Sequence, residues 1–183
     1  MIIAVEGNVH VGKTTYCNNF VQQNSEYEIV GECKFDPTLS AYDTQLNYLR
    51  QEQDKKKNYN SDNLIMDRSI VSTFIYTTFT DTLTIQQKQD IIQKIKNLIN
   101  QQGVILPQKI VFLVTDANLV AQRQMSLGKI KGTQTVLGSL DYYNYYNDFF
   151  LAHNPELIEI DRQNKIYNID AELVLNTIKE YNI

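Results

Sequence analysis

The sequence predicts an α/β fold in which a parallel β-sheet is covered by helices on both faces. Short apolar runs alternate with longer segments of helical periodicity along the 183 residues, and this alternation is typical of strand–helix units that build a parallel sheet. Residues 109–115 (KIVFLVT) are continuously apolar, as expected of a strand buried on both faces. We therefore expect a three-layer sandwich with about five parallel strands, formed by a single domain over residues 1–183.

The first apolar run ends at a loop that fits the phosphate-binding pattern G-x-x-x-x-G-K-[ST]. Gly7, Gly12, Lys13 and Thr14 take the required places, and glycine permits the tight bends that let backbone N–H groups surround a triphosphate. Lys13 is expected to reach the β- and γ-phosphates and the Thr14 hydroxyl to hold Mg²⁺. A helix predicted over residues 13–22 points its positive end at the anion. The pattern indicates a P-loop NTPase type of sandwich that binds ATP. The expected nucleotide contacts are Gly7, Asn8, Val9, His10, Val11, Gly12, Lys13, Thr14 and Thr15.

The remaining elements follow from apolar periodicity and from helix-start signals. Later strands are expected over residues 27–32, 63–69, 109–115 and 157–161. Later helices are expected within 38–53, from 70 to about 79, from 85 to near 103, from 117 to about 127, over 140–152 and after 170. Thr84 and Gln87 have the spacing of a capping box, and Asp116 and Asp170 are expected to cap later helices. Residues 51–62 are expected to form a solvated loop, and the glycine-containing residues 126–138 a short mobile lid.

Four tyrosines in the predicted helix over residues 140–152 have two interpretations. Tyr142, Tyr143, Tyr145 and Tyr146 could stack against a nucleotide base or pack in the core. Helical spacing and a large apolar area favour packing.

The composition excludes several classes of protein. A formal net charge of −4 argues against binding of a polynucleotide by broad electrostatic attraction, whereas a small anion needs only a local positive pocket. Cys17 and Cys33 are too few for a disulfide framework and lack metal-ligand spacing. Because a strand begins at Ile2 and no long apolar segment occurs, we expect neither a targeting segment nor a membrane span. We therefore expect a cytoplasmic protein with a small-molecule partner.

Side chains suited to phosphoryl transfer follow the second and third predicted strands. Glu32, Asp67 and Arg68 come where strands end, on the same sheet edge as the phosphate loop, and ligands of parallel sheets bind at that edge. Asp67 is expected to bind Mg²⁺ together with Thr14, and Arg68 to hold phosphate through two N–H groups. Glu32 is the expected general base. The alternatives are a weak surface ion pair of Asp67 with Arg68, and a merely solvated Glu32.

With these residues in place, the sequence resembles the deoxynucleoside kinase and thymidylate kinase group of P-loop kinases over nearly its whole length. VEGNVHVGKTT (residues 5–15) is similar to the phosphate loop of the group, and MDRS (66–69) to the ERS motif of deoxynucleoside kinases and the DRY/DRH motif of thymidylate kinases. YEIVGE (27–32) is similar to the strand that ends in the catalytic carboxylate. The resemblance implies that Glu32 activates the acceptor hydroxyl and that a homodimer is an option.

The resemblance also implies contacts with the acceptor and in the lid. In LNYLRQEQ, Arg50 matches an arginine that contacts the acceptor, although an exposed helix residue is an equal alternative, and Gln45 precedes it at the place of a base-reading glutamine. Tyr76 is expected to shape the same pocket. RQMSLGKIKG resembles an arginine-rich lid, which implies that Arg123 and Lys129 neutralise charge on ATP during transfer.

Departures from the family pattern concern the acceptor phosphate and the lid. Gly31 stands where thymidylate kinases usually have an arginine, and Cys33 where a proline is usual. Leu127 stands at a lid position where both branches prefer arginine. Lys129 or His10 would therefore have to supply the positive charge of that arginine. His10 has a second interpretation, since loop residues between the glycines often point to solvent.

The favoured hypothesis is an ATP-dependent deoxynucleoside kinase. Asn8, Gly31 and Ser69 resemble the nucleoside branch, whereas Asp67 and SIVSTFIY (69–76) resemble the thymidylate branch. The first alternative is a thymidylate kinase-like nucleoside monophosphate kinase. The second is a regulatory protein that binds nucleotide and transfers nothing.

Overall fold

The computed structural model of the protein describes residues 1–126, 139–160 and 164–183. It is an α/β fold with a mixed six-stranded sheet in the order β2-β3-β1-β4-β6-β5. The strands are β1 (Ile2–Gly7), β2 (Glu28–Val30), β3 (Leu64–Asp67), β4 (Lys109–Thr115), β5 (Glu156–Ile160) and β6 (Asn164–Asp170). The helices are α1 (Lys13–Gln23), α2 (Ala41–Asn58), α3 (Ile70–Phe79), α4 (Ile85–Asn100), α5 (Ala117–Ser126), α6 (Leu140–Leu151) and α7 (Ala171–Glu180).

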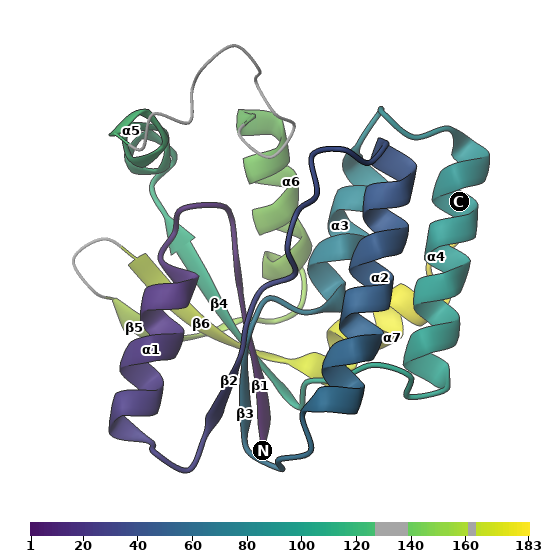
Figure 1. Ribbon diagram of the computed structural model, residues 1–183. Coiled ribbons are helices and arrows are strands. Elements are labelled where there is room, and N and C mark those ends of the chain that lie inside the picture. Colours follow the sequence, from purple (N-terminus) through teal and green to yellow (C-terminus); the bar gives the residue numbers. More distant parts are fainter. Residues whose placement is uncertain (127–138, 161–163) are drawn as a thin grey trace.

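Helices cover both faces of the sheet, as the sequence predicts (Figure 1). Alternate residues of β1 enter two separate apolar clusters. Ile3 and Val5 pack with Cys17 of α1 and Val120 of α5, whereas Ala4 faces the larger cluster built by α2, α3, α4, α6 and α7. Among the described residues, no helix combines the length and the apolar character needed to cross a membrane.

The mixed sheet adds one strand to the expected set. β1 pairs in parallel with β3 and β4, and β2 pairs in parallel with β3. β6 is antiparallel to both β4 and β5, so β5 runs in the same direction as the four parallel strands. The sequence reading missed β6 because NKIYNID is rich in polar residues and only two of its seven side chains are buried.

Two other expectations are affected by the structure. The loop expected over residues 51–62 is wrong for its first part, because α2 continues to Asn58. Three consecutive lysines fill the last turn of α2, where positive charge stabilises the negative end of a helix. The lid expected at 126–138 lies almost wholly outside the described residues, and so do Leu127 and Lys129.

The predicted helix starts are confirmed by side-chain caps. Thr84 and Gln87 form the capping box of α4. Asp116 accepts from the backbone N–H groups of Asn118 and Leu119, and Asp170 caps α7. Such caps satisfy N–H groups that have no partner within a helix.

Gly7 is required where β1 enters the phosphate loop. Its φ is 152°, and an added Cβ would lie 2.6 Å from the Leu113 carbonyl oxygen and 2.8 Å from Val11 Cγ2. Because backbone strain and overpacking each cost about 1–3 kcal/mol, we expect Gly7→Ala to lower the free energy of unfolding by about 2–4 kcal/mol in urea denaturation. Gly31→Ala is the control, since that glycine has open space and an ordinary φ. An equal effect of the two substitutions would contradict this account.

Candidate active site

The phosphate loop leaves backbone donors free at the start of α1. Gly12 adopts a left-handed conformation with a φ of 102° and no side chain caps the helix. The first N–H groups of α1 are therefore available to an anion, and the helix dipole favours negative charge there. Asn8 fixes the other end of the loop, because its Nδ2 donates to Asn147 Oδ1 of α6 at 3.0 Å. Thr15, like Thr14, is exposed at the beginning of the helix.

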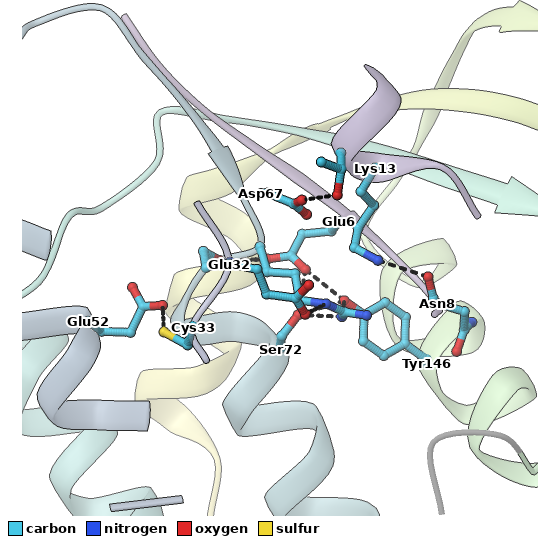
Figure 2. Close-up of polar contacts among 12 residues, drawn as sticks. Glu6, Asn8, Lys13, Glu32, Cys33, Glu52, Asp67, Ser72 and Tyr146 are labelled. Atoms are coloured by element: carbon cyan, nitrogen blue, oxygen red, sulfur yellow. Dashed lines mark hydrogen bonds and ion pairs between the residues drawn. The ribbon is translucent and has the colours of Figure 1, made fainter. Parts of the chain in front are cut away.

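Lys13 places its amino group under the loop, and no carboxylate among the described residues forms an ion pair with it. Its side chain is buried, and its Nζ donates to the Asn8 carbonyl at 3.0 Å (Figure 2). Burial, followed by the charge of Arg68, lowers the pKa of Lys13 to about 7, although the charges of Glu32, Asp67 and Glu6 act in the opposite direction. The free protein thus has a primary amine that gains a proton readily when negative charge arrives.

Asp67 and Thr14 form an arrangement that fits Mg²⁺. Thr14 Oγ1 donates to Asp67 Oδ2 at 2.5 Å. Asp67 Oδ1 is buried and has no hydrogen-bond partner among the described residues. A carboxylate oxygen and a hydroxyl are ligands that Mg²⁺ accepts, with water and phosphate oxygens completing its shell. Among the described residues, no group of three or more His, Cys, Asp or Glu side chains could hold a metal ion.

The turn after β3 directs Arg68 toward the second predicted carboxylate. Arg68 has a φ of 69°, which reverses the chain between β3 and the N-cap of α3 at Ser69. Its Nε lies 2.7 Å from Glu32 Oε1 but forms no hydrogen bond among the described residues, so the contact is an ion pair. Arg68 pairs with Glu32 and not with Asp67. Glu32, Asp67 and Lys13 lie near one another at this sheet edge (Figure 2), and the charge of Arg68 acts on Lys13.

A buried carboxylate, Glu6, is linked to Arg68 through shared hydrogen-bond partners. Glu6 Oε1 accepts from the Ser69 N–H at 2.9 Å and the Ser69 hydroxyl at 2.7 Å. Its Oε2 accepts from Ser72 at 2.7 Å and from Tyr146 at 2.6 Å. Arg68 Nη1 donates in turn to Ser72 at 3.0 Å and Tyr146 at 3.3 Å. Sequence reasoning missed this network, although a lone carboxylate inside an apolar strand is the signal that could have revealed it.

Two pockets adjoin the phosphate loop. Val9 lines the first pocket, of about 230 Å³, whereas the next residue, His10, lines the second, of about 450 Å³. The second pocket also contains Arg123 of α5, whose Nη1 donates to the His10 carbonyl at 2.7 Å. The predicted acceptor-binding residues Glu32, Gln45, Arg68 and Tyr76 line the first pocket, and so does Val9, which was expected to contact the nucleotide.

Arg50 and the tyrosines of α6 differ in whether they reach the pockets. Arg50 is exposed on α2 and is not among the residues that line either pocket. Tyr142 and Tyr146 are buried and pack in the core, in agreement with the favoured interpretation. Tyr142 also lines the first pocket. Sequence reasoning missed Glu52 of α2, a buried carboxylate in the wall of the same pocket.

Solved structures with a similar fold include nucleoside and nucleotide kinases. No family model and no curated protein matches the sequence. A deoxyadenosine kinase from M. mycoides with bound dATP has a TM-score of 0.64 and 18% identity, covering 82% of this chain and 84% of that chain. The same kinase with dCMP and dCDP has a TM-score of 0.62 and 18% identity, covering 98% and 95%. A thymidylate kinase from Candida albicans has a TM-score of 0.58 and 19% identity, covering 82% and 76%. The predicted resemblance to P-loop kinases is therefore confirmed at the level of the fold.

The low pKa of Lys13 predicts that nucleotide binding takes up a proton. At pH 8 most Lys13 side chains of the free protein are neutral, since the pKa is about 7. Bound phosphates favour the charged form, so ATP binding at pH 8 should be accompanied by uptake of about one proton, and of less at pH 6. Calorimetric titrations in buffers of different ionisation enthalpy measure this number. Lys13→Met should remove the uptake, and an unchanged uptake would show that another group is responsible.

The Glu6 network predicts a difference between two neighbouring tyrosines. Tyr146→Phe deletes a buried donor to Glu6 and should lower the free energy of unfolding by about 1–3 kcal/mol. Tyr145 is exposed and donates only to Thr78, so Tyr145→Phe should change it by less than about 1 kcal/mol. Chemical denaturation of both variants checks the order, and equal losses would contradict the role assigned to Tyr146.

Proposed function

We propose that the protein is an ATP-dependent deoxynucleoside kinase that transfers the γ-phosphoryl group of MgATP to the 5′-hydroxyl of a deoxynucleoside. The observation that carries this proposal is a pair of pockets lined by neighbouring residues of one phosphate loop, Val9 in one pocket and His10 in the other. Transfer between two substrates needs this arrangement, because donor and acceptor must meet over the phosphates. We assign ATP to the pocket of His10 and Arg123, and the acceptor to the pocket of Glu32.

Glu32 and Arg68 are assigned to the reacting hydroxyl. Arg68 occupies Glu32 Oε1, so Oε2 is the oxygen that we assign to the proton of the acceptor. As that proton moves to Glu32, the 5′-oxygen forms its bond to the γ-phosphorus, and the bond from that phosphorus to the bridging oxygen of ADP breaks. Arg68, held by Ser72 and Tyr146, would stabilise the charge that develops on the transferred group.

Lys13, the loop N–H groups and Arg123 are assigned to the donor phosphates. Thr14 and Asp67 would hold Mg²⁺, because the unpartnered Asp67 Oδ1 fits a ligand that the protein itself does not supply. The metal, when bound, would neutralise charge on the β- and γ-phosphates. Lys129 stays a proposed lid contact. The deoxyadenosine kinase solved with dATP and with dCMP and dCDP shares this fold, which supports a nucleotide ligand here.

A thymidylate kinase-like activity is the second candidate, supported by the fold of the Candida albicans enzyme. It is the weaker one, because a monophosphate acceptor brings additional negative charge. Among the described residues, Arg68 is the one cationic residue lining the acceptor pocket, and Glu32 already pairs with it. Arg50 lies outside that lining and Gly31 contributes no charge. A regulatory protein without transfer activity is the third candidate, and the acceptor pocket argues against it.

Glu32→Gln tests the proposed reaction. Loss of the general base should lower the turnover of a deoxynucleoside about 100-fold or more, while the affinity for ATP stays within about twofold. Glu28→Gln is the control, since Glu28 is an exposed residue of the same strand segment. Both proteins are assayed with MgATP against deoxynucleosides and deoxynucleoside monophosphates. Turnover of dTMP alone would favour the second candidate, and ATP binding without turnover of any acceptor the third.

A further inference from the structure

Glu52 of α2 lines the acceptor pocket and has one carboxylate oxygen without a hydrogen-bond partner among the described residues. Its side chain is almost completely buried, yet it lines that pocket. Oε1 is occupied by Lys55 Nζ at 2.8 Å and by the Cys33 thiol at 3.1 Å. Oε2 is buried and has no hydrogen-bond partner among the described residues. A buried acceptor without a donor is unfavourable, so a molecule in the pocket is the natural source of the missing donor.

The neighbours of Glu52 hold the carboxylate in place without occupying Oε2. Burial and the charge of Glu52 raise the pKa of Cys33 to about 12, so Cys33 remains a thiol and donates its proton. Lys55 is itself buried and forms an ion pair with Glu52. The pair fixes the orientation of the carboxylate group. Oε2 is therefore a rigid acceptor, and a rigid acceptor discriminates between ligands more sharply than a mobile one.

The position of Glu52 separates it from the reacting end of the pocket. Gln45, Tyr48 and Glu52 are spaced at three and seven residues along α2 and all line the pocket, as expected of one helix face. In Figure 2, Glu52 and Cys33 lie to one side of Glu32, and Lys13 lies to the other. The 5′-hydroxyl belongs beside Glu32 in the proposed function, so the base of the same nucleoside extends toward the face of α2. Gln45 Oε1 is a second buried acceptor that has no hydrogen-bond partner among the described residues.

We infer that Glu52 determines base specificity by accepting a hydrogen bond from an exocyclic amino group, so that the preferred acceptor is a 6-aminopurine or 4-aminopyrimidine deoxynucleoside. This inference rests on the proposed function. A carboxylate only accepts hydrogen bonds. A base with a carbonyl at the corresponding place would direct its own lone pairs at Oε2, and both groups would stay without a donor. Sites that hydrogen-bond a substrate group reject analogues that lack it, because buried polar atoms are then unpaired.

Matched ligand pairs test the inference on the unaltered protein. Deoxycytidine differs from deoxyuridine, and deoxyadenosine from deoxyinosine, by an amino group in place of a carbonyl and by an unprotonated ring nitrogen beside it in place of an N–H. Dissociation constants are measured by calorimetry in the presence of a non-hydrolysable ATP analogue and Mg²⁺. In at least one pair, the amino member should bind about 10- to 100-fold more tightly. Equal binding within both pairs, or a preference for the carbonyl member, would overturn the inference.

Glu52→Gln then separates Glu52 from other causes of discrimination. An amide can donate as well as accept, so the ratio within the discriminating pair should fall to about threefold or less. Asp54→Asn is the control, because Asp54 lies exposed on the same helix, and it should retain the ratio of the unaltered protein. A ratio retained in Glu52→Gln would assign the selectivity elsewhere. If Glu52→Gln does not fold, the unaltered protein still provides a test. Equal dissociation constants within both ligand pairs would then overturn the inference.

The outcomes also distinguish the inference from the proposed function. Deoxynucleosides that bind and turn over without amino preference would overturn only the role of Glu52. Binding of the ATP analogue without binding of any deoxynucleoside would overturn the kinase proposal, and the role of Glu52 with it.

Discussion

The buried cation Lys13 is the constraint on which the rest of the site depends. Its ammonium group lies under a loop of backbone donors and contacts a carbonyl oxygen instead of a carboxylate. Burial makes the charged form of Lys13 unfavourable, so in the protein without ligand its ammonium group loses a proton near pH 7. A bound polyphosphate reverses this balance. Among the described residues Lys13 pairs with no carboxylate, so this sheet edge suits an anionic ligand.

The carboxylates of the site are arranged so that they do not neutralise that cation. Glu6 is saturated by Ser69, Ser72 and Tyr146 and acts on Arg68 through two of these residues. Glu32 pairs with Arg68 on the acceptor side. Asp67 is directed toward Thr14. Each carboxylate therefore has its own partner, and Lys13 remains for phosphate.

Local sequence patterns predicted those parts of the fold and site that local chemistry determines. The phosphate loop, the buried strand β4 and the capping box at Thr84 each lie within a few residues, and each is where the pattern placed it. The contacts of Glu6 with Tyr146 and of Asn8 with Asn147 join residues about 140 positions apart, and no periodicity reports such pairs. β6 was not predicted, because its polar residues are typical of a loop. Helical spacing predicted the helix that contains Arg50. It did not predict which face of that helix is exposed, because this depends on how α2 packs against α3 and α4.

The central claim is that donor and acceptor sites open onto one phosphate loop. Its most direct test is the affinity of a bisubstrate analogue, in which adenosine is joined through five phosphates to the 5′-oxygen of deoxyadenosine or deoxycytidine. Occupation of both pockets by one molecule should give a dissociation constant about 100-fold or more below that of ATP, since the second binding event is then intramolecular. A bisubstrate analogue that binds no more tightly than ATP would contradict the shared cleft.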